Sequence, residues 1–416
     1  MRAVTAAVGL ATLAAAELFA KRCGSPLPAV RVDRAHAALA FRRERYARPL
    51  GWELPPLWDP IAGDYATRDG WIRLHTNYSH HRRAALAVLG VEPARDAVAP
   101  AVAGWPSEEL EQAVLDRGGC AAAMRTLDAW RAHPQGAAVA REPVVAIERS
   151  GPAMLPASRV VRPLSGVRVL DLTRVIAGPV CTGFLAAWGA DVLRLDPPGF
   201  EEVPGLLPET TAGKRRAMLD LRDPRGRDRF AELLRDAHVL VTGYRPDALP
   251  RLDLAPARLR AQHPSLLVAT LDAYGFTGPW ARRRGFDSLV QMSTGIAARG
   301  AEVYGPSSPH PLPAQALDHA SGFLLAAGVC RALADGAAGE VRVSLARRAA
   351  LLVDLGERDP STRGPGEEDL EPWLEEVPTA WGPLRRVRLP GEIEGVASAV
   401  GPPPGPLGSD PPAWTA

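Results

Sequence analysis

The stretch VRVLDLTRVIAGPVCTGFLAAWGADVLRL, residues 167–195, decides the fold class. It begins with an apolar run containing β-branched residues, 167–172, and ends with a similar run, 191–195. Between them, Pro179 to Trp188 has a helical composition, with proline at its first position and glycine just past its end, the usual asymmetry of helix termini. Strand, helix and strand at this spacing predict a βαβ unit, and such units build parallel sheets. Amides of the first turn, from Gly178 onward, would face a ligand at the carboxyl end of the first strand.

The same alternation continues downstream. Short apolar runs predict strands at 217–221, 239–241, 266–271 and 341–345, and helical segments are expected at 224–236, 256–262 and 314–334. The expected fold is therefore α/β, a doubly wound and mainly parallel sheet. We expect a smaller, mostly helical N-terminal region at 1–145, with a strand at 70–75 and a helix at 120–131. We also expect a linker at 146–163, the α/β domain at 164–350 and a Pro/Gly-rich C-terminal segment at 351–416. Within this last segment, residues 401–413 are expected to be loosely ordered.

Composition bounds the function. The chain has 416 residues, 46% hydrophobic and 23% charged, and its net charge of +2 gives no global attraction to nucleic acid or to a membrane. Its four cysteines form no CxxC pair, so reduced, buried cysteines in a cytoplasmic protein are expected. His80 and His81 lack further ligands at suitable spacing, and no metal site is predicted.

The first apolar segment, 4–19, has two interpretations. A signal peptide is the first. Against it stand the single leading Arg2, Glu17 within the segment and Lys21-Arg22 after it. The segment also looks too short and too weakly apolar to span a bilayer. A buried or amphipathic helix is the favoured interpretation.

Nucleotide and hydrolase fingerprints are absent: the chain has no GxGxxG after the first strand, no GxxxxGK[ST] and no GxSxG. Basic residues instead gather near the expected strand ends, which would suit a phosphate-bearing ligand, although a solvated surface is the alternative for any single one. They are Arg174, Lys214, Arg215, Arg216, Arg222, Arg245 and Arg251. Asp287 and Asp318 each precede an apolar helix; by physics alone a helix cap is favoured, and a nucleophilic carboxylate is the sharper hypothesis.

Five stretches, in order, bring these features together. They read LSGVRVLDLTRVIAGPVCTGFLAAWGADVLRLDPPG (164–199), GKRRAMLDLRDPRGR (213–227), VLVTGYRPDALPRLDL (239–254), LLVATLDAYGFTGPWARRRGFDSLVQMSTG (266–295) and LDHASGFLLAAGVCRAL (317–333) with GEVRVSL (339–345). They resemble the family III CoA-transferases, the CaiB/BaiF group of formyl-CoA and carnitine CoA-transferases. The resemblance implies a transferase that moves CoA between an acyl-CoA and a carboxylic acid through an aspartyl covalent intermediate.

The resemblance also implies roles for particular residues. The family's nucleophile is the aspartate of a GD motif, which falls on Asp318, with Leu317 in place of the glycine. The CoA-contacting positions fall on Arg174, Ile176, Ala177, Leu221, Arg222, Gly243, Tyr244, Arg251, Leu252, Arg284, Gly285, Phe286 and Asp287. The implied substrates are an acyl-CoA and a small carboxylic acid, with no permanent cofactor, nucleic acid or membrane partner, and a homodimer is the expected assembly.

The chain departs from the family in its order, because residues 58–145 resemble the family's small domain but precede the core. A catalytically silent CoA-binding or acyl-CoA-binding homologue is therefore the second hypothesis, and a nucleotide-dependent oxidoreductase a distant third. The racemase branch of the superfamily has histidine before the aspartate of its GYD-like segment, where this chain has Phe286, so the proton-transfer pair of a racemase is not expected.

Overall fold

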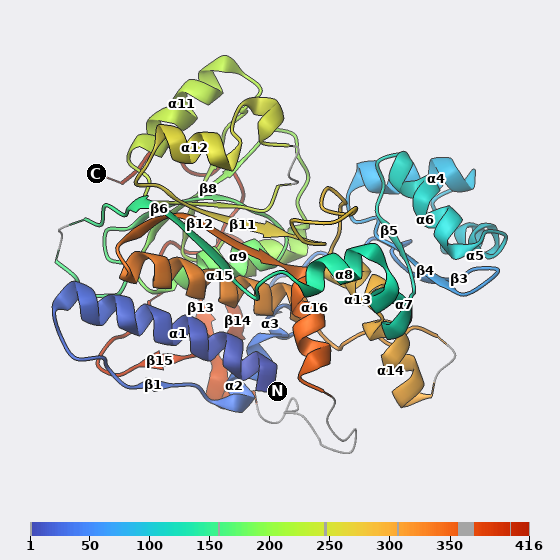
Figure 1. Cartoon of the computed structure of the whole chain (residues 1–416), viewed down its shortest axis with the longest axis horizontal. Helices are drawn as coiled ribbons and strands as arrows, with labels where there is room; N and C mark the ends of the chain where they lie inside the picture. Colours follow the sequence, from blue (N-terminus) through green and yellow to red (C-terminus); the bar gives the residue numbers. More distant parts are fainter. Residues whose placement is uncertain are drawn as a thin grey trace.

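A large α/β unit and a smaller unit beside it make up the computed structural model, which describes residues 2–156, 159–244, 248–305, 308–356, 370–399 and 401–415 (Figure 1). The large unit is built on a seven-stranded sheet in the order β6-β12-β11-β10-β7-β8-β9. All neighbouring strands are parallel except β6 and β12. The strands are β6 (Ala146–Pro152), β7 (Arg168–Leu172), β8 (Asp191–Asp196), β9 (Lys214–Met218), β10 (Val239–Thr242), β11 (Leu267–Asp272) and β12 (Ala337–Ser344). The predicted doubly wound, mainly parallel sheet is confirmed.

The strand order reverses at the middle of this sheet. From β7 the chain moves outward through β8 and β9, then returns to β10 on the other side of β7 and continues outward through β11 and β12. This reversal places a topological switch point between β7 and β10. In open α/β sheets, ligands bind outside the carboxyl ends of the strands at such a point.

Alternate residues of the strands face opposite layers of helices. Val169 and Val241 belong to the core beneath α9 (Ala177–Ala187), α15 (Ala316–Ala334) and α1 (Arg2–Cys23). Leu170 and Leu240 face the other way, toward α11 (Pro224–Arg235) and α12 (Pro256–Gln262). Figure 1 shows these two layers on opposite sides of the sheet. Because both faces are covered, the central strands β7, β10 and β11 are mostly apolar.

Helix α1 packs along α15, with Val8, Ala11 and Ala15 buried in the large core. The helix has 22 residues and is long and apolar enough to cross a membrane by length and composition. The expectation that this segment is too short to span a bilayer is therefore wrong, because the helix extends beyond residue 19 to Cys23. Half of its most apolar stretch is buried against the rest of the chain, as a core helix requires. Cys23 is exposed, whereas the other three cysteines are buried as expected, and none of the four forms a disulfide.

Gly322 lets α15 approach α9 closely. A Cβ atom at residue 322 would lie 2.5 Å from the carbonyl oxygen of Ala177 and 2.7 Å from the Cβ of Val180. We expect Gly322→Ala to lower the free energy of unfolding by about 1–3 kcal/mol, because neither contact can yield without moving a helix. Gly183→Ala is the matched control, since no atom lies within 4 Å of its Cβ position and alanine favours the helix by about 1 kcal/mol. Urea denaturation measures the free energy of unfolding of both variants. Equal changes in the two variants would contradict the close approach of α15 to α9 at Gly322.

The smaller unit is a three-stranded antiparallel sheet covered by helices. It contains β3 (Gly63–Ala66), β4 (Trp71–Leu74) and β5 (Ala121–Ala123), with α4 (Ser79–Leu89), α5 (Arg95–Ala103) and α6 (Ser107–Asp116). The predicted strand at 70–75 is confirmed. The helix expected at 120–131 is wrong at its start, because residues 121–123 pair with β4 and only Leu127–Ala132 is helical (α7). The three alanines are buried on both faces, which favours pairing with a neighbouring strand over their own helical preference.

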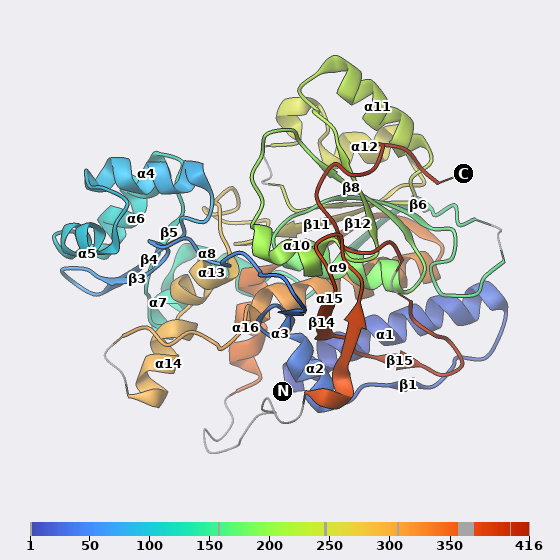
Figure 2. The same cartoon turned by 180° about the vertical axis from the view of Figure 1, so that it is seen from behind.

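Both segments expected to be irregular contain ordered structure. The expected linker begins with β6, which pairs with β12 along the edge of the large sheet. The expectation of loose order at 401–413 is wrong, because this segment binds β9 through Gly213 N to Pro402 O (2.9 Å) and Asp410 N to Arg216 O (2.8 Å). Figure 2 shows the C-terminal segment running along this side of the molecule.

The remaining elements connect or flank these units. They are β1 (Val30–Arg31), paired with β15 (Glu392–Ile393); the sheet β13 (Leu374–Val377), β14 (Leu384–Val387) and β2 (Arg48–Pro49); and the helices α2 (Arg34–Ala40), α3 (Arg43–Tyr46), α8 (Pro134–Ala140), α10 (Leu207–Thr210), α13 (Asp287–Ser293), α14 (Ile296–Tyr304) and α16 (Leu345–Asp354).

Candidate functional site

A cavity of about 420 Å³ opens at the switch point of the sheet. The loops that follow β7, β10 and β11 line it, and the segment before α13 and the start of α15 close it. Of the sequence-predicted site residues, it is lined by Arg174, Ile176, Ala177, Gly243, Tyr244, Arg284, Gly285, Phe286 and Asp318. These positions come from four separate segments of the chain, and the fold brings them to one place.

A second cavity, of about 240 Å³, adjoins the first and shares Tyr244 and Phe200 with it. Leu221, Arg222 and Leu252 line it, so the structure also places these predicted positions along the carboxyl edge of the sheet. Arg251 is exposed and lines neither cavity.

The basic cluster predicted at the strand ends is only partly there. Arg174 and Arg222 lie at the carboxyl edge, and Arg245 lies outside the described residues. Lys214, Arg215 and Arg216 do not lie there, because they begin β9 and therefore sit toward its opposite end. Lys214 forms an ion pair with Asp171, Arg215 with Asp191 and Arg216 with Asp410. Their charges are therefore neutralised by partners within the fold.

The loop after β7 has an unusual backbone. Val175 has φ of 64°, in the left-handed region that β-branched residues seldom adopt. It lies between Arg174 and Ile176, both of which line the cavity. Strain of this kind costs of order 1–3 kcal/mol and is concentrated at functional sites. The loop is thus held in a conformation that the surrounding structure imposes.

Arg174 is the cation best placed for an anionic ligand. Its guanidinium lies 3.6 Å from the ring centroid of Phe200 and 5.8 Å from that of Tyr244. Its Nε is 3.7 Å from Oδ1 of Asp196, and its buried Nη2 has no hydrogen-bond partner among the described residues. The aromatic rings fix the guanidinium while leaving this donor available, a geometry that suits a phosphate oxygen.

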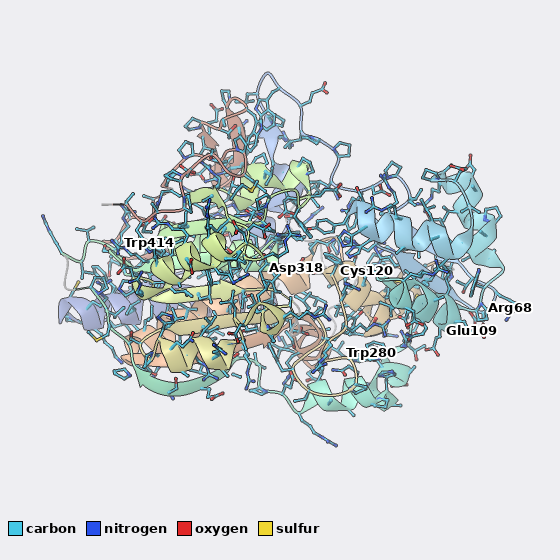
Figure 3. The ribbon with its side chains drawn as sticks, turned by 90° about the horizontal axis from the view of Figure 1, so that it is seen from above. Arg68, Glu109, Cys120, Trp280, Asp318 and Trp414 are labelled. Carbon is cyan, nitrogen blue, oxygen red and sulfur yellow. The ribbon has the colours of Figure 1, made fainter. Side chains whose placement is uncertain are left out.

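Asp318 lies in the first turn of α15, buried, and lines the first cavity. It does not cap the helix; the backbone N–H of Asp318 instead donates to Oδ2 of Asp287 at 2.9 Å. Oδ1 of Asp287 accepts from Nε2 of Gln291 at 2.5 Å. Asp287 thus performs the capping role, and the Asp318 carboxylate is left facing the cavity. Figure 3 shows Asp318 between the large sheet and the smaller unit, with Cys120 on the side of the smaller unit.

The carboxyl groups of Asp287 and Glu44 lie near that of Asp318. Burial raises the pKa of Asp318 well above its usual range, and the negative charges of Asp287 and Glu44 raise it further. Burial also raises the pKa of Asp287 to about 6, against the hydrogen bonds that it accepts. For Glu44, burial raises the pKa, but His319 outweighs this effect and holds it below its usual value, with Nε2 3.0 Å from Oε2. Glu44 therefore stays ionised, and Asp318 ionises with difficulty until a ligand changes its surroundings.

The smaller unit completes the site with residues that sequence reasoning missed. Phe286 stacks on His75 with ring centroids 3.7 Å apart and also contacts the rings of Tyr78 and His81. Tyr78, His80 and His81 line the first cavity. Their signal in the sequence was an aromatic and histidine-rich segment at the start of α4. No group of three or more His, Cys, Asp or Glu residues that could hold a metal occurs in the part of the chain that the structure describes.

Asp272, at the end of β11, lines the first cavity and is buried. Its Oδ1 accepts the N–H groups of Tyr274 (2.9 Å) and Gly275 (3.0 Å). Burial raises its pKa to about 7 in spite of these bonds, and Glu142 adds to the rise. An unfolded aspartate titrates near pH ~4, so ionisation of Asp272 lowers the stability progressively between about pH 4 and pH 7, and by a constant amount above that.

We expect Asp272→Asn to raise the free energy of unfolding at pH 8 by about 1–3 kcal/mol, because the amide oxygen accepts the same bonds without a charge. Below about pH 4 the gain should vanish, since the aspartate is protonated in both states. Urea titrations at the two pH values measure it. Asp253→Asn, at an exposed aspartate, is the control. The same gain in the free energy of unfolding at both pH values would contradict the view that ionisation of Asp272 costs stability.

Residues 164–359, which include the part of the site formed by the large unit, match the sequence profile described as CoA-transferase family III. Residues 164–359 are therefore similar to CoA-transferase family III. The chain is similar to the probable fatty acyl-CoA transferase Rv3272 of Mycobacterium tuberculosis, with 34% identity over 192 residues, 43% of this chain and 48% of that protein. It is also similar to a formyl-CoA:oxalate CoA-transferase of Rhodopseudomonas palustris, with 31% identity over 186 residues, 42% of this chain and 43% of the relative.

The chain spans about half the length of these curated relatives. A crystal structure of Rv3272 from M. tuberculosis aligns with a TM-score of 0.42 and 31% identity, over 49% of this chain and 62% of that one.

Within the family III region, Leu317 occupies an ordinary helical position. It is buried beside Ala177 and Val290, and it is not among the described non-glycine residues with positive φ. The backbone next to Asp318 therefore does not need glycine in this chain.

Proposed function

We propose that this chain transfers CoA from an acyl-CoA to a carboxylic acid through a covalent intermediate on Asp318. The observation that carries the proposal is the position of the Asp318 carboxylate, buried at the wall of the switch-point cavity and not used as a helix cap. The family assignment of residues 164–359 supports CoA chemistry in general.

Each step uses this carboxylate. An Asp318 oxygen attacks the thioester carbonyl carbon, the C–S bond breaks, and CoA leaves as the thiolate while a mixed aspartyl-acyl anhydride remains. The thiolate then attacks the Asp318 carbonyl carbon, which releases the donor acid and leaves an aspartyl-CoA thioester. The acceptor carboxylate displaces the thiolate to form a second anhydride, and the thiolate attacks its acyl carbon. Acyl-CoA departs and the Asp318 carboxylate is restored. Division into easier steps is the general advantage of nucleophilic catalysis.

The CoA would extend from Asp318 along the carboxyl edge of the sheet. In this proposal Arg174 binds a phosphate oxygen through Nη2, and Tyr244, Leu221 and Leu252 line the path into the second cavity. Arg222 is exposed at its far end and pairs with Asp220. The two cavities share lining residues, so one extended ligand can occupy both.

The proposal extends to the setting of the enzyme. The substrates would be an acyl-CoA and a small carboxylic acid, without a permanent cofactor. Three buried cysteines that form no disulfide suit a reducing compartment, so we propose the cytoplasm. A homodimer is proposed from the resemblance to the family alone.

The test is the intact mass of the protein after incubation with acyl-CoAs, followed by hydroxylamine. We expect a CoA adduct that hydroxylamine removes and that Asp318→Asn abolishes. Ser321→Ala, one turn further along α15 and equally buried, is the matched control and should retain the adduct. An adduct that persists in Asp318→Asn would overturn the assigned nucleophile. Saturable CoA binding without any adduct would instead identify a silent CoA-binding homologue.

A further inference from the structure

A small cavity of about 90 Å³ borders Asp318 and adjoins the main cavity. The two share Asp318, Ile176 and Phe286 as lining residues. A thioester carbonyl held at Asp318, with the CoA chain in the main cavity, would direct its acyl group into this smaller space. The small cavity is therefore where the acyl group would be selected.

Its volume limits the length of the acyl group. At about 90 Å³ it is much smaller than the main cavity of about 420 Å³. The walls include the rings of Trp58, Tyr78 and Phe286, which belong to packed elements of both units. This space therefore favours a short acyl group over a long alkyl chain.

Two buried polar atoms in this wall have no partner among the described residues, Nδ1 of His75 and Oγ of Ser288. Both residues are about 4% exposed. The amide of neighbouring Asn77 is already used, since Oδ1 accepts from Asp59 N and Nδ2 donates to Leu57 O. An unpaired buried polar group costs free energy, so a ligand that pairs with these atoms gains affinity.

His75 is held as a neutral ring. Burial lowers its pKa to about 3, and the positive charges of His81 and Arg73 lower it further. Stacking on Phe286 fixes the orientation of the ring. A neutral imidazole and a hydroxyl can pair with an uncharged hydroxyl or keto oxygen.

The charges in the wall are negative. Glu44, Asp287 and Asp318 line the small cavity, and no lysine or arginine does so within the described parts of the chain. Glu44 is already paired with His319. A second carboxylate on the acyl group would meet like charges at short range, which is unfavourable in a buried site.

We propose that the small cavity selects short, uncharged acyl groups that carry a hydroxyl or keto oxygen, and that it rejects dicarboxylates and long alkyl chains. This inference rests on the transferase function proposed above. It assigns His75 and Ser288 as the residues that determine this specificity.

The test measures affinity by calorimetry in Asp318→Asn, which cannot consume the ligand. Lactoyl-CoA and isobutyryl-CoA are compared because they differ only by a hydroxyl in place of a methyl group. We expect lactoyl-CoA to bind at least about fivefold more tightly. Malonyl-CoA and octanoyl-CoA should bind at least about tenfold more weakly than lactoyl-CoA. Equal affinities for the first pair, tight binding of either of the last two, or no binding at all would overturn the proposal.

Variants assign the effect to the two residues. Ser288→Ala and His75→Phe, each made in the same background, should bring the ratio of the lactoyl-CoA and isobutyryl-CoA affinities close to one. Ser293→Ala is the matched control, because Ser293 lies on the same helix but bonds to Tyr274 and lines no part of this cavity. A ratio that survives both substitutions would contradict the assignment. Selective binding without any covalent adduct in the wild-type protein would refute the proposed transferase function and leave the specificity intact.

Discussion

Replacement of Asp318 by asparagine is expected to lower kcat for CoA transfer by at least a factor of about 10³, with little change in the affinity for CoA. The amide has nearly the shape of the carboxylate but lacks its nucleophilic oxygen, so no anhydride forms. The residues proposed to bind CoA lie on other elements and should stay in place. Steady-state kinetics and calorimetry with CoA measure the two quantities.

The same substitution should make the protein more stable at neutral and alkaline pH. Burial and the charges of Asp287 and Glu44 raise the pKa of Asp318, so ionisation of this residue costs stability that increases as the pH rises above the unfolded value of about 4. Asparagine removes that cost. The gain in urea resistance of the variant over wild type should be larger at pH 8 than at pH 5. A variant that is inactive and shows this gain has lost the nucleophile without losing the fold.

The rate of the wild-type enzyme should also increase with pH. In the proposed mechanism only the ionised Asp318 attacks a thioester, and burial raises the pKa of this residue well above its ordinary range. The rate of adduct formation under single-turnover conditions should therefore keep rising above the pH range in which an ordinary aspartate ionises, and it should reach a plateau once Asp318 is ionised. A rate that falls over this interval would contradict a carboxylate nucleophile.

The sheet was predictable because its signal is local. The β7–α9–β8 unit carries apolar strands, an N-terminal proline and a C-terminal glycine within thirty residues, and the structure agrees closely with these limits. By contrast, β9 begins at Lys214, earlier than the apolar run that predicted it. The charged start of this strand could not be recognised, because Asp171, the partner that allows its burial, is distant in the sequence.

The candidate site was predictable where motifs resemble the family and not where two units meet. The positions around Arg174, Tyr244 and Phe286 were placed by motif and converge on one cavity. His75 and Glu44 were missed, because each comes from the N-terminal half and reaches the site only through packing between units. Neither carries a local pattern that distinguishes a site residue from a structural one.

Lys214→Met is expected to lower the free energy of unfolding by about 3–5 kcal/mol. Nζ of Lys214 lies 3.0 Å from Oδ2 of Asp171 and 3.2 Å from the carbonyl oxygen of Pro179, and both charged side chains are fully buried. Removal of the lysine leaves the Asp171 carboxylate without its cation in the interior. Urea denaturation at pH 7 measures the loss. Arg222→Met, at an exposed pair with Asp220, is the matched control and should change stability by less than about 1 kcal/mol.

The pH dependence identifies the cause of this loss. Burial raises the pKa of Asp171, but Lys214 and Arg194 outweigh it and hold the pKa below the ordinary value. The paired carboxylate therefore contributes stability above the unfolded pKa, which is lost as the pH falls through the folded value. In Lys214→Met the carboxylate loses its paired cation, so the deficit should be larger at pH 7 than at pH 4, where Asp171 can accept a proton.

The double variant Asp171→Leu, Lys214→Met separates the charge from the packing. If the cost in Lys214→Met comes from an unpaired charge, removal of both groups should recover most of the stability, because two apolar side chains often replace a buried pair without loss. The turn after β7 should nevertheless become less well fixed, since Asp171 also accepts from Thr173 N (2.9 Å) and from Thr182 Oγ1 (2.6 Å). That turn carries Arg174 and Ile176 into the cavity. We therefore expect a stable double variant with weakened CoA affinity. If stability and CoA affinity both returned to the wild-type values, the Asp171–Lys214 pair would contribute to folding alone.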